Sequence, residues 1–305
     1  MDRSLALPLP PEPTLIERAA AALDFGIRSG ADAAGTGTGT TGSGSRGPTA
    51  RPGLLDLDRT VLQAAGVLTP DRLRTRLAEE VRLIKRLLLA RLSQNGGPAG
   101  KALMLTSALP GEGKTWLAAN LAISIANERD LGVVLVDADL ARPSLLRLLG
   151  VEAPDLPGLS SLLEDAALDA GSCVRDTSIP GLRLLPPGPA HALSTELLTS
   201  QRMADLIAEI GRRFPDHVLI FDTAPVLATT LPAALFDHMA EVLFVVEANA
   251  TRGRDVTESL ELLGDPAKVS LVLNKCRHVI GERGAGSRYG YDYESYYGGP
   301  RDGRT

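Results

Sequence analysis

The chain has 305 residues, of which 44% are hydrophobic and 23% are charged, and its formal net charge is −5 at pH 7. That length supports one sizeable hydrophobic core with extensions. The negative charge argues against a nucleic-acid-binding protein, because such proteins neutralise phosphates with excess lysine and arginine. The two cysteines, Cys173 and Cys276, form no CxxC or Cys/His cluster, which argues against a disulfide scaffold or a zinc site and indicates a reducing compartment.

The N-terminus lacks a basic stretch followed by an apolar one, so the sequence predicts no secretory signal. No apolar run approaches the roughly 20 residues needed to span a bilayer. We therefore expect a soluble, cytoplasmic protein, which leaves docking on a membrane-bound partner open.

Residues 1–28 form the first predicted segment, with a short helix over Thr14–Arg28. One face of this helix is apolar and carries Leu15, Ile16, Ala19, Ala20, Leu23 and Ile27. Its charged residues cancel, so attraction to anionic lipids is weak and packing on its own protein or on a partner is favoured. Residues 29–53 are mostly glycine, threonine, serine and alanine, which predicts a flexible linker.

Residues 54–99 are predicted to be a helical segment. A helix is expected after Thr69, which can cap it, with Pro70 at the first helical position. Its apolar stripe holds Leu73, Leu77, Val81, Ile84 and Leu88. The stretch Asn95–Pro98 is expected to end the helix.

Residues 100–280 alternate short apolar strands with helical patterns. The expected strands are Lys101–Ser107, Val133–Val136, Leu182–Leu185, Val218–Phe221, Val242–Val246 and Val269–Leu273, and the expected helices include Thr115–Asn127 and Thr195–Arg213, the latter capped by Ser194. Near-continuous apolar strands separated by helices indicate an α/β fold, in which a mostly parallel twisted sheet carries helices on both faces.

A phosphate-binding loop follows the first of these strands, in the sequence Ala108-Leu-Pro-Gly-Glu-Gly-Lys-Thr115. Backbone N–H groups of such a loop point at the phosphates of a nucleotide, a lysine neutralises their charge and a threonine hydroxyl ligates Mg²⁺. The strand before it and the helix after it are the context that this motif requires. We assign to nucleotide binding Gly111, Glu112, Gly113, Lys114, Thr115 and Trp116.

Three aspartates lie at or just after strand ends. Asp137 ends the second strand, Asp139 follows two residues later, and Asp222 ends another strand in the sequence Asp-Thr-Ala-Pro, which resembles a Walker B site. A lone aspartate at a strand end is often only a helix cap. Three carboxylates that share one edge with a phosphate loop instead predict a site that orients Mg²⁺ and accepts the proton of an attacking hydroxyl.

The C-terminal segment, residues 281–305, is rich in glycine and contains every tyrosine of the chain: Tyr289, Tyr291, Tyr293, Tyr296 and Tyr297. Such a segment is not expected to bury its rings, and exposed phenols on a flexible tail are good substrates. Its charges are balanced, which argues against an aromatic tail that stacks on RNA. Tyr289 lies fifteen residues beyond Asn274, a maximum reach of roughly 50 Å, enough to enter the site of a neighbouring subunit.

Together these motifs resemble a bacterial tyrosine kinase. This family is linked to exopolysaccharide production and belongs with the MinD/ParA-like P-loop ATPases. The exosortase-associated tyrosine autokinase branch is the most similar. Supporting stretches are Thr14–Arg18, Glu79–Arg86, Thr195–Leu198 and Val272–Lys275. The resemblance covers about residues 70–297 and the first helix. It implies an ATP- and Mg²⁺-dependent autokinase that phosphorylates its own tyrosine tail and regulates polysaccharide chain length.

The resemblance also implies residue roles. Lys114 and Thr115 hold phosphate and Mg²⁺, Asp137 is the best candidate for the base that activates tyrosine, and Asp139 and Asp222 complete the shell around metal and water. Thr115, Asp137 and Asp222 are the expected metal ligands. Asn274 has two possible roles, recognition of adenine or a position in a turn.

Self-association in this family involves a pattern Glu-x2-Arg-x2-Arg, matched here by Glu79, Arg82 and Lys85. Lysine at the third position weakens bidentate pairing, and an ordinary solvated helix face remains an alternative. A further departure is Ala141, where many relatives carry arginine. The implied partners are other copies of the chain, a membrane-embedded polysaccharide co-polymerase that activates the kinase at the inner membrane, and a tyrosine phosphatase.

Two other functions remain open. A MinD/ParA-type ATPase, which switches dimers to position cargo and has no kinase activity, typically carries an extra lysine early in the phosphate loop. The stretch Ala108–Glu112 lacks this lysine. A nucleotide-gated adaptor without enzymatic activity would not need Lys114, Thr115, Asp137 and Asp222 together. The tyrosine tail favours the kinase over both.

Overall fold

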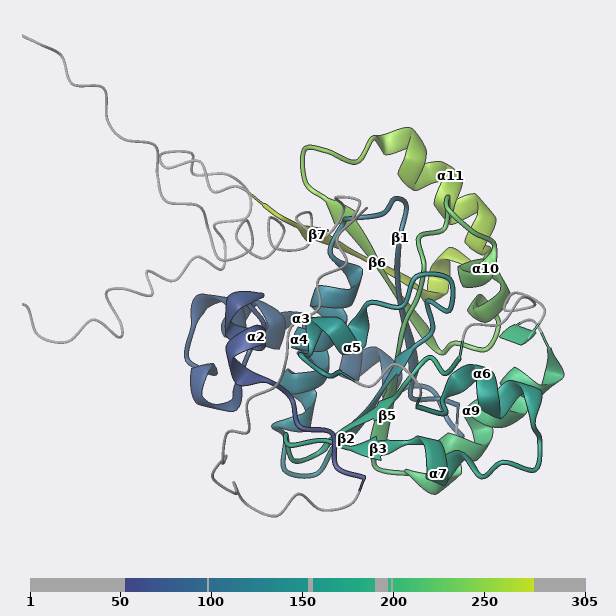
Figure 1. Ribbon diagram of the computed structural model, residues 1–305. Helices are drawn as coiled ribbons and strands as arrows, with labels where there is room; N and C mark the ends of the chain where they lie inside the picture. Colours follow the sequence, from purple (N-terminus) through teal and green to yellow (C-terminus); the bar gives the residue numbers. More distant parts are fainter. Residues whose placement is uncertain (1–52, 98, 153–155, 190–196, 199, 277–305) are drawn as a thin grey trace, which may run out of the picture.

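The computed structural model describes residues 53–97, 99–152, 156–189, 197–198 and 200–276 (Figure 1). Their centre is a seven-stranded sheet with the strand order β3-β4-β2-β5-β1-β6-β7. Every neighbouring pair is parallel except β3–β4. The predicted fold class is thereby confirmed.

The strands are short and their central members are fully buried. They are β1 (Ala102–Ser107), β2 (Gly132–Asp137), β3 (Arg175–Asp176), β4 (Leu182–Leu185), β5 (His217–Asp222), β6 (Glu241–Glu247) and β7 (Val269–Asn274). All six residues of β1 and of β2 are buried. Continuous apolar runs are what strands covered on both faces require, and six of the seven were predicted from that pattern.

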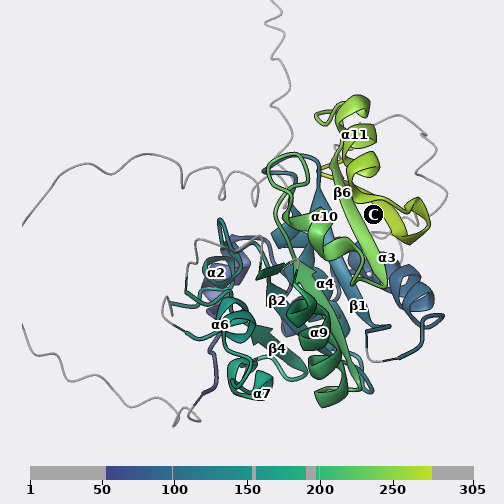
Figure 2. The same cartoon turned by 90° about the vertical axis from the view of Figure 1, so that its right-hand side faces the viewer.

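The helices lie on both faces of the sheet. They are α2 (Arg59–Ala64), α3 (Arg76–Leu92), α4 (Lys114–Ala126), α5 (Leu145–Leu148), α6 (Leu159–Glu164), α7 (Ala170–Cys173), α9 (Gln201–Arg213), α10 (Leu231–Phe236) and α11 (Gly253–Leu263), with 3-10 turns η1 (Pro70–Arg72) and η2 (Pro266–Lys268). In Figure 1, α2, α3 and α4 lie to the left of α6, α9 and α10. Figure 2 views the molecule from the side of α6, α9 and α10.

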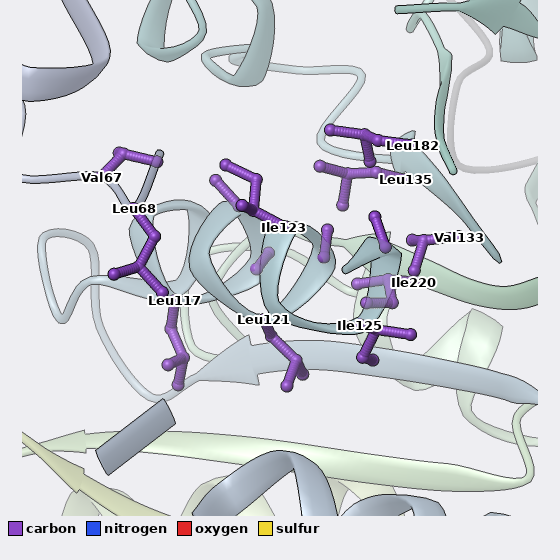
Figure 3. Packing of buried hydrophobic residues seen from close by; sticks show 14 of the residues in the cluster. Val67, Leu68, Leu117, Leu121, Ile123, Ile125, Val133, Leu135, Leu182 and Ile220 are labelled. Carbon is purple, nitrogen blue, oxygen red and sulfur yellow. The ribbon is translucent and has the colours of Figure 1, made fainter. Parts of the chain in front are cut away.

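Alternation along the strands sends side chains into two separate cores. Leu103 and Leu105 of β1 join the core under α2, α3 and α4, whereas Met104 joins the core under α6, α9 and α10. Helix α4 is at the centre of the first core, and Figure 3 shows Ile125 of α4 beside Ile220 of β5, with Val133 and Leu135 of β2 and Leu182 of β4 nearby. Because α4 is buried on nearly all sides, its sequence is apolar all round.

The helix predicted to start after Thr69 begins later. Pro70–Arg72 form only the 3-10 turn η1, and α3 begins at Arg76, where the Thr75 hydroxyl accepts a hydrogen bond from Ala78 N at 3.2 Å. Thr69 is the N-cap residue of η1 with Pro70 at its first position, as predicted, but its hydroxyl makes no capping hydrogen bond and the long helix starts elsewhere. Thr75 supplies what a helix N-terminus needs, an oxygen for an otherwise unpaired N–H.

Other differences concern lengths and short elements. Helix α9 begins at Gln201, and the expected start at Ser194 and Thr195 lies outside the described residues. Residues 55–97 pack through α2 and α3 onto the core that contains α4, and Leu55 forms a bridge with Thr177.

No helix within the described part of the chain is both long and apolar enough to cross a membrane.

Candidate nucleotide-binding and catalytic site

The phosphate loop joins β1 to α4 at the carboxyl edge of the sheet. Gly111 and Gly113 have φ angles of 84° and 93°, a left-handed region that favours glycine. Gly113 is the residue before α4, and Lys114 is the first residue of the helix, with 7% of its surface exposed. The unpaired N–H groups of the first turn of α4 and the Lys114 ammonium therefore lie at the same place, which suits bound phosphate.

The side chain of Glu112 holds this loop to the rest of the protein. Glu112 is buried, and its carboxylate accepts hydrogen bonds from Leu109 N at 2.6 Å and from Glu247 N at 3.4 Å. The hydroxyl of Thr251 also donates to it. The carboxylate of Glu112 thus fastens the loop to the end of β6, and the predicted nucleotide contact of this residue stays a prediction.

Asn274 fastens the loop from a second side. It is the last residue of β7, and its Nδ2 donates to the carbonyl oxygen of Glu112 at 2.8 Å. Sequence reasoning left Asn274 open between adenine recognition and a turn. In the structure its amide is a support for the phosphate loop, a role that no local pattern indicated.

Asp137 and Asp222 are register partners at the ends of β2 and β5. Both are buried, and Asp137 Oδ2 accepts a hydrogen bond from Leu145 N at 3.2 Å. The other oxygen of Asp137 and both oxygens of Asp222 have no hydrogen-bond partner among the described residues. Buried carboxylate oxygens without partners are costly, so they point to a ligand that completes the site.

Electrostatics at this pair is dominated by burial. Burial, together with the negative charge of Asp222, raises the pKa of Asp137 well above its ordinary value. Burial also raises the pKa of Asp222 to about 7, while the positive charge of Lys114 acts in the opposite direction. Two carboxylates in one desolvated site hold protons tightly until a cation joins them.

Asp139 and Thr115 lie at the more open side of the site. Asp139 is half-buried and accepts a hydrogen bond from Arg142 N at 3.1 Å. Burial raises its pKa, opposed by that hydrogen bond and by the charge of Lys114. The Thr115 hydroxyl lies 3.3 Å from the hydroxyl of Ser144, a residue that sequence reasoning did not single out.

The residues present fit a magnesium ion bound together with a nucleotide. No cluster of three or more His, Cys, Asp or Glu side chains able to hold a metal occurs in the described ranges. Mg²⁺ at phosphate sites usually takes only one or two carboxylates, with phosphate oxygens and waters as its other ligands. The Thr115 hydroxyl and the unpartnered oxygens of Asp222 and Asp137 are donors of that kind.

Hydrogen bonds between β1 and the chain after β5 fix Asp222 relative to the loop. The Thr106 hydroxyl donates to the Ala224 carbonyl at 2.9 Å, and the Thr223 hydroxyl donates to the Leu105 carbonyl at 2.8 Å. These bonds fasten the segment that follows Asp222 to the strand that precedes the phosphate loop. Threonines at these positions thus keep two parts of the site together.

Trp116 was predicted to contact the nucleotide. Its indole N–H donates to the carbonyl oxygen of Ala65 at 3.0 Å, and only 4% of its surface is exposed. The indole therefore connects α4 to the end of α2. A direct nucleotide contact of Trp116 stays a prediction.

The three residues predicted for self-association do not share one exposed face. Glu79 and Arg82 form an ion pair with each other and remain about half exposed. Lys85 is buried, donates to the Ser124 carbonyl at 3.1 Å and pairs with Glu128. Lys85 thus faces α4 within its own chain, because its ammonium meets the carbonyl end of that helix.

The tyrosines at positions 289, 291, 293, 296 and 297 lie outside the described residues. The described chain ends at Cys276, two residues after Asn274 and therefore close to the phosphate loop.

Known proteins resemble this chain in both sequence and fold. The tyrosine-protein kinase Wzc of Salmonella typhimurium is 34% identical over 196 residues, which is 63% of this chain and 26% of the relative. The tyrosine-protein kinase CpsD of Streptococcus pneumoniae is 30% identical over 201 residues, which covers 65% of this chain and 86% of the relative. This chain belongs to the bacterial tyrosine-protein kinases.

A solved structure supports this family assignment. The kinase domain VpsO is 30% identical with a TM-score of 0.54, and the match covers 67% of this chain and 100% of that domain. The chain thus contains the kinase domain of this family, but it spans only about a quarter of the length of Wzc. The septum site-determining protein MinD of Synechocystis is also similar, with 30% identity over 58% of this chain and 65% of the relative. No protein-family model matches the chain.

Proposed function

We propose that this member of the bacterial tyrosine-protein kinases transfers the γ-phosphoryl group of ATP to tyrosines in its own C-terminal segment. The observation that carries the proposal is the buried pair Asp137 and Asp222, whose unpartnered oxygens lie at the same sheet edge as the phosphate loop. Family membership supports tyrosine as the acceptor. The acceptors proposed are Tyr289, Tyr291, Tyr293, Tyr296 and Tyr297.

In the proposed reaction, a phenol oxygen attacks the γ-phosphorus of ATP. A bond forms between these two atoms, and the bond from the γ-phosphorus to the bridging oxygen breaks, so that ADP leaves. The phenol proton passes to Asp137. The Asp137 oxygen that has no hydrogen-bond partner among the described residues is available for this proton.

The other residues of the site position the phosphates of ATP and neutralise their charge. The N–H groups of the loop and the Lys114 ammonium hold the β- and γ-phosphates, and the loop keeps its shape through Glu112 and Asn274. Thr115, Asp137 and Asp222 would hold Mg²⁺, with Asp139 at the edge of its water shell. When bound, Mg²⁺ neutralises charge that develops on the phosphate oxygens.

The test is the mass of the C-terminal peptide after incubation with Mg-ATP. The protein and its Lys114→Met variant are treated in parallel, and the peptide that contains residues 289–297 is weighed. We expect added phosphates with the unaltered protein and none with the variant. Unchanged peptide mass together with measurable ATP hydrolysis, also after the co-polymerase's cytoplasmic segment is added, would refute the kinase proposal.

That second outcome would favour a MinD-type ATPase, the alternative that the similarity to MinD supports. The stretch Ala108–Glu112 lacks the additional lysine expected of that group, and the tyrosine-rich segment has no role in it. For these two reasons the kinase is the better-supported function.

We propose transfer between chains, which the length of the tail permits: Tyr289 lies thirteen residues beyond Cys276, a maximum reach of roughly 45 Å that is enough to enter the site of a neighbouring chain. A Lys114→Met chain with its tail is mixed with an active chain that lacks residues 281–305. Label on the Lys114→Met chain would establish transfer between chains, and an unlabelled chain would exclude it.

The biological setting follows from the same resemblance. We propose that the kinase acts in exopolysaccharide production, in the cytoplasm at the inner membrane, where a membrane-embedded co-polymerase activates it and a tyrosine phosphatase reverses it. Self-association would involve Glu79 and Arg82, with Lys85 acting inside its own chain. Activation by a cytoplasmic segment of the co-polymerase can be measured as an increase in the tail phosphorylation rate.

A further inference from the structure

We propose that the groove between α3 and β7 is the docking site of residues 14–28 of the same chain, the N-terminal segment whose sequence predicts an amphipathic helix. The groove has a volume of about 460 Å³. Its apolar lining comes from both sides and from α4: Leu77, Leu83, Ile84, Trp116, Val272 and Leu273.

The groove belongs to a surface that exposes large apolar side chains. Leu83 is 42% exposed and Leu273 is 65% exposed, and both line the groove. Leu87, one turn after Leu83 on α3, is 67% exposed. Within the described residues β7 is an edge strand, paired only with β6. Exposed apolar residues on a helix beside an edge strand are characteristic of an interaction surface.

Residues 14–28 have the matching chemistry. Their apolar residues recur at helical spacing, and their charged residues, of both signs, fall on the other faces. The rim of the groove also carries both signs, with Arg76, Glu80 and Lys275. A helix of this length is about 22 Å long and is marginal alone in water, so it needs an apolar surface against which to form.

Residues 29–52 connect residues 14–28 to the described chain and are long enough to reach the groove. Residues 29–52 are rich in glycine, serine and threonine, and the described chain begins beside β3, where Leu55 pairs with Thr177. Strand β7 is at the opposite edge of the sheet, roughly 29 Å away at about 4.8 Å per strand spacing. Linkers of this composition and of 24 residues have a root-mean-square span of about 25–29 Å.

This match favours residues 14–28 over other occupants. A linker whose average span equals the separation of two sites gives the highest effective concentration, in the millimolar range. The described chain ends at Cys276, which lines the groove, but between Cys276 and the tyrosines the only aliphatic residues larger than alanine are Val279 and Ile280. Because Trp116 and Asn274 also line the groove, a docked segment lies next to the phosphate loop.

The native cysteines provide the test. Cys276 is exposed and lines the groove, whereas Cys173 is buried, so iodoacetamide should modify Cys276 selectively. The rate of this modification is measured by mass spectrometry in the unaltered full chain and in an Ile16→Asp/Leu23→Asp variant. Docking should slow modification of Cys276 severalfold in the unaltered chain relative to the variant.

Two controls make the result specific. A Glu17→Ala/Arg18→Ala variant changes only the polar face and should retain the protection. The measurement is repeated over a hundredfold range of protein concentration: a constant rate is expected for docking within one chain, whereas protection that grows with concentration would assign the groove to a second copy. Equal rates in the unaltered chain and the Ile16→Asp/Leu23→Asp variant would overturn the proposal.

Discussion

Replacing Gly113 by alanine should destabilise the protein more than replacing Gly111, although both glycines have left-handed backbones. Their φ angles are 93° and 84°, and alanine in this region costs about 1–2 kcal/mol at either position. A Cβ on Gly113 would lie 2.2 Å from Asn274 Nδ2, whereas a Cβ on Gly111 meets no atom within 4 Å. Moving Asn274 would leave the Glu112 carbonyl without its donor, which costs about 1–3 kcal/mol more.

The expected loss of unfolding free energy is therefore about 2–5 kcal/mol for Gly113→Ala and about 1–2 kcal/mol for Gly111→Ala. Urea unfolding followed by circular dichroism of the nucleotide-free proteins measures both. In an Asn274→Ala background the collision is removed, so Gly113→Ala should then cost no more than Gly111→Ala. Equal losses for the two glycine variants in the unaltered background would show that the Asn274 contact is not the cause.

Three further predictions concern buried charges. Glu112→Gln should lower the free energy of unfolding by about 1.5–3 kcal/mol, because its charged carboxylate accepts several hydrogen bonds, while exposed Glu258→Gln should change it by less than about 0.5 kcal/mol in the same urea titration. Lys85→Met should cost about 1–3 kcal/mol in thermal unfolding, and the half-exposed Arg82→Met less than about 1 kcal/mol; equal losses would contradict the buried role of Lys85. Since the folded-state pKa of Asp222 is raised to about 7, its contribution to stability is complete below its unfolded pKa near 4 and declines as pH rises toward 7. Without nucleotide and Mg²⁺, Asp222→Asn should flatten that decline, and an unchanged pH profile would refute the assignment.

The sequence predicted the parts of this fold that depend on local patterns. Buried parallel strands need continuous apolar residues, so β1, β2 and β5 were recognisable. The phosphate loop was recognisable because its glycines and lysine are adjacent in the chain. Asp137 and Asp222 were grouped correctly, since the carboxyl ends of parallel strands meet at one edge of the sheet.

What the sequence did not predict depends on contacts between distant residues. The apolar stripe of α3 was expected to exclude Lys85, yet this residue is buried because its ammonium reaches Ser124 and Glu128, about 40 positions away. Likewise, the role of Glu112 depends on Glu247 and that of Asn274 on a loop 162 residues earlier. Periodicity and propensity carry no information about such partners.

The long separation between the phosphate loop and its supports has a consequence for biosynthesis. Asn274, which donates to the Glu112 carbonyl, is translated 162 residues after that loop. At about 5–20 residues per second the ribosome takes roughly 8–30 s to cover that distance. During that interval the nascent chain contains the complete nucleotide motif without the strand that braces it. Nucleotide capture is therefore expected to be among the last events of maturation, and a chain released before Asn274 would carry the motif without a working site.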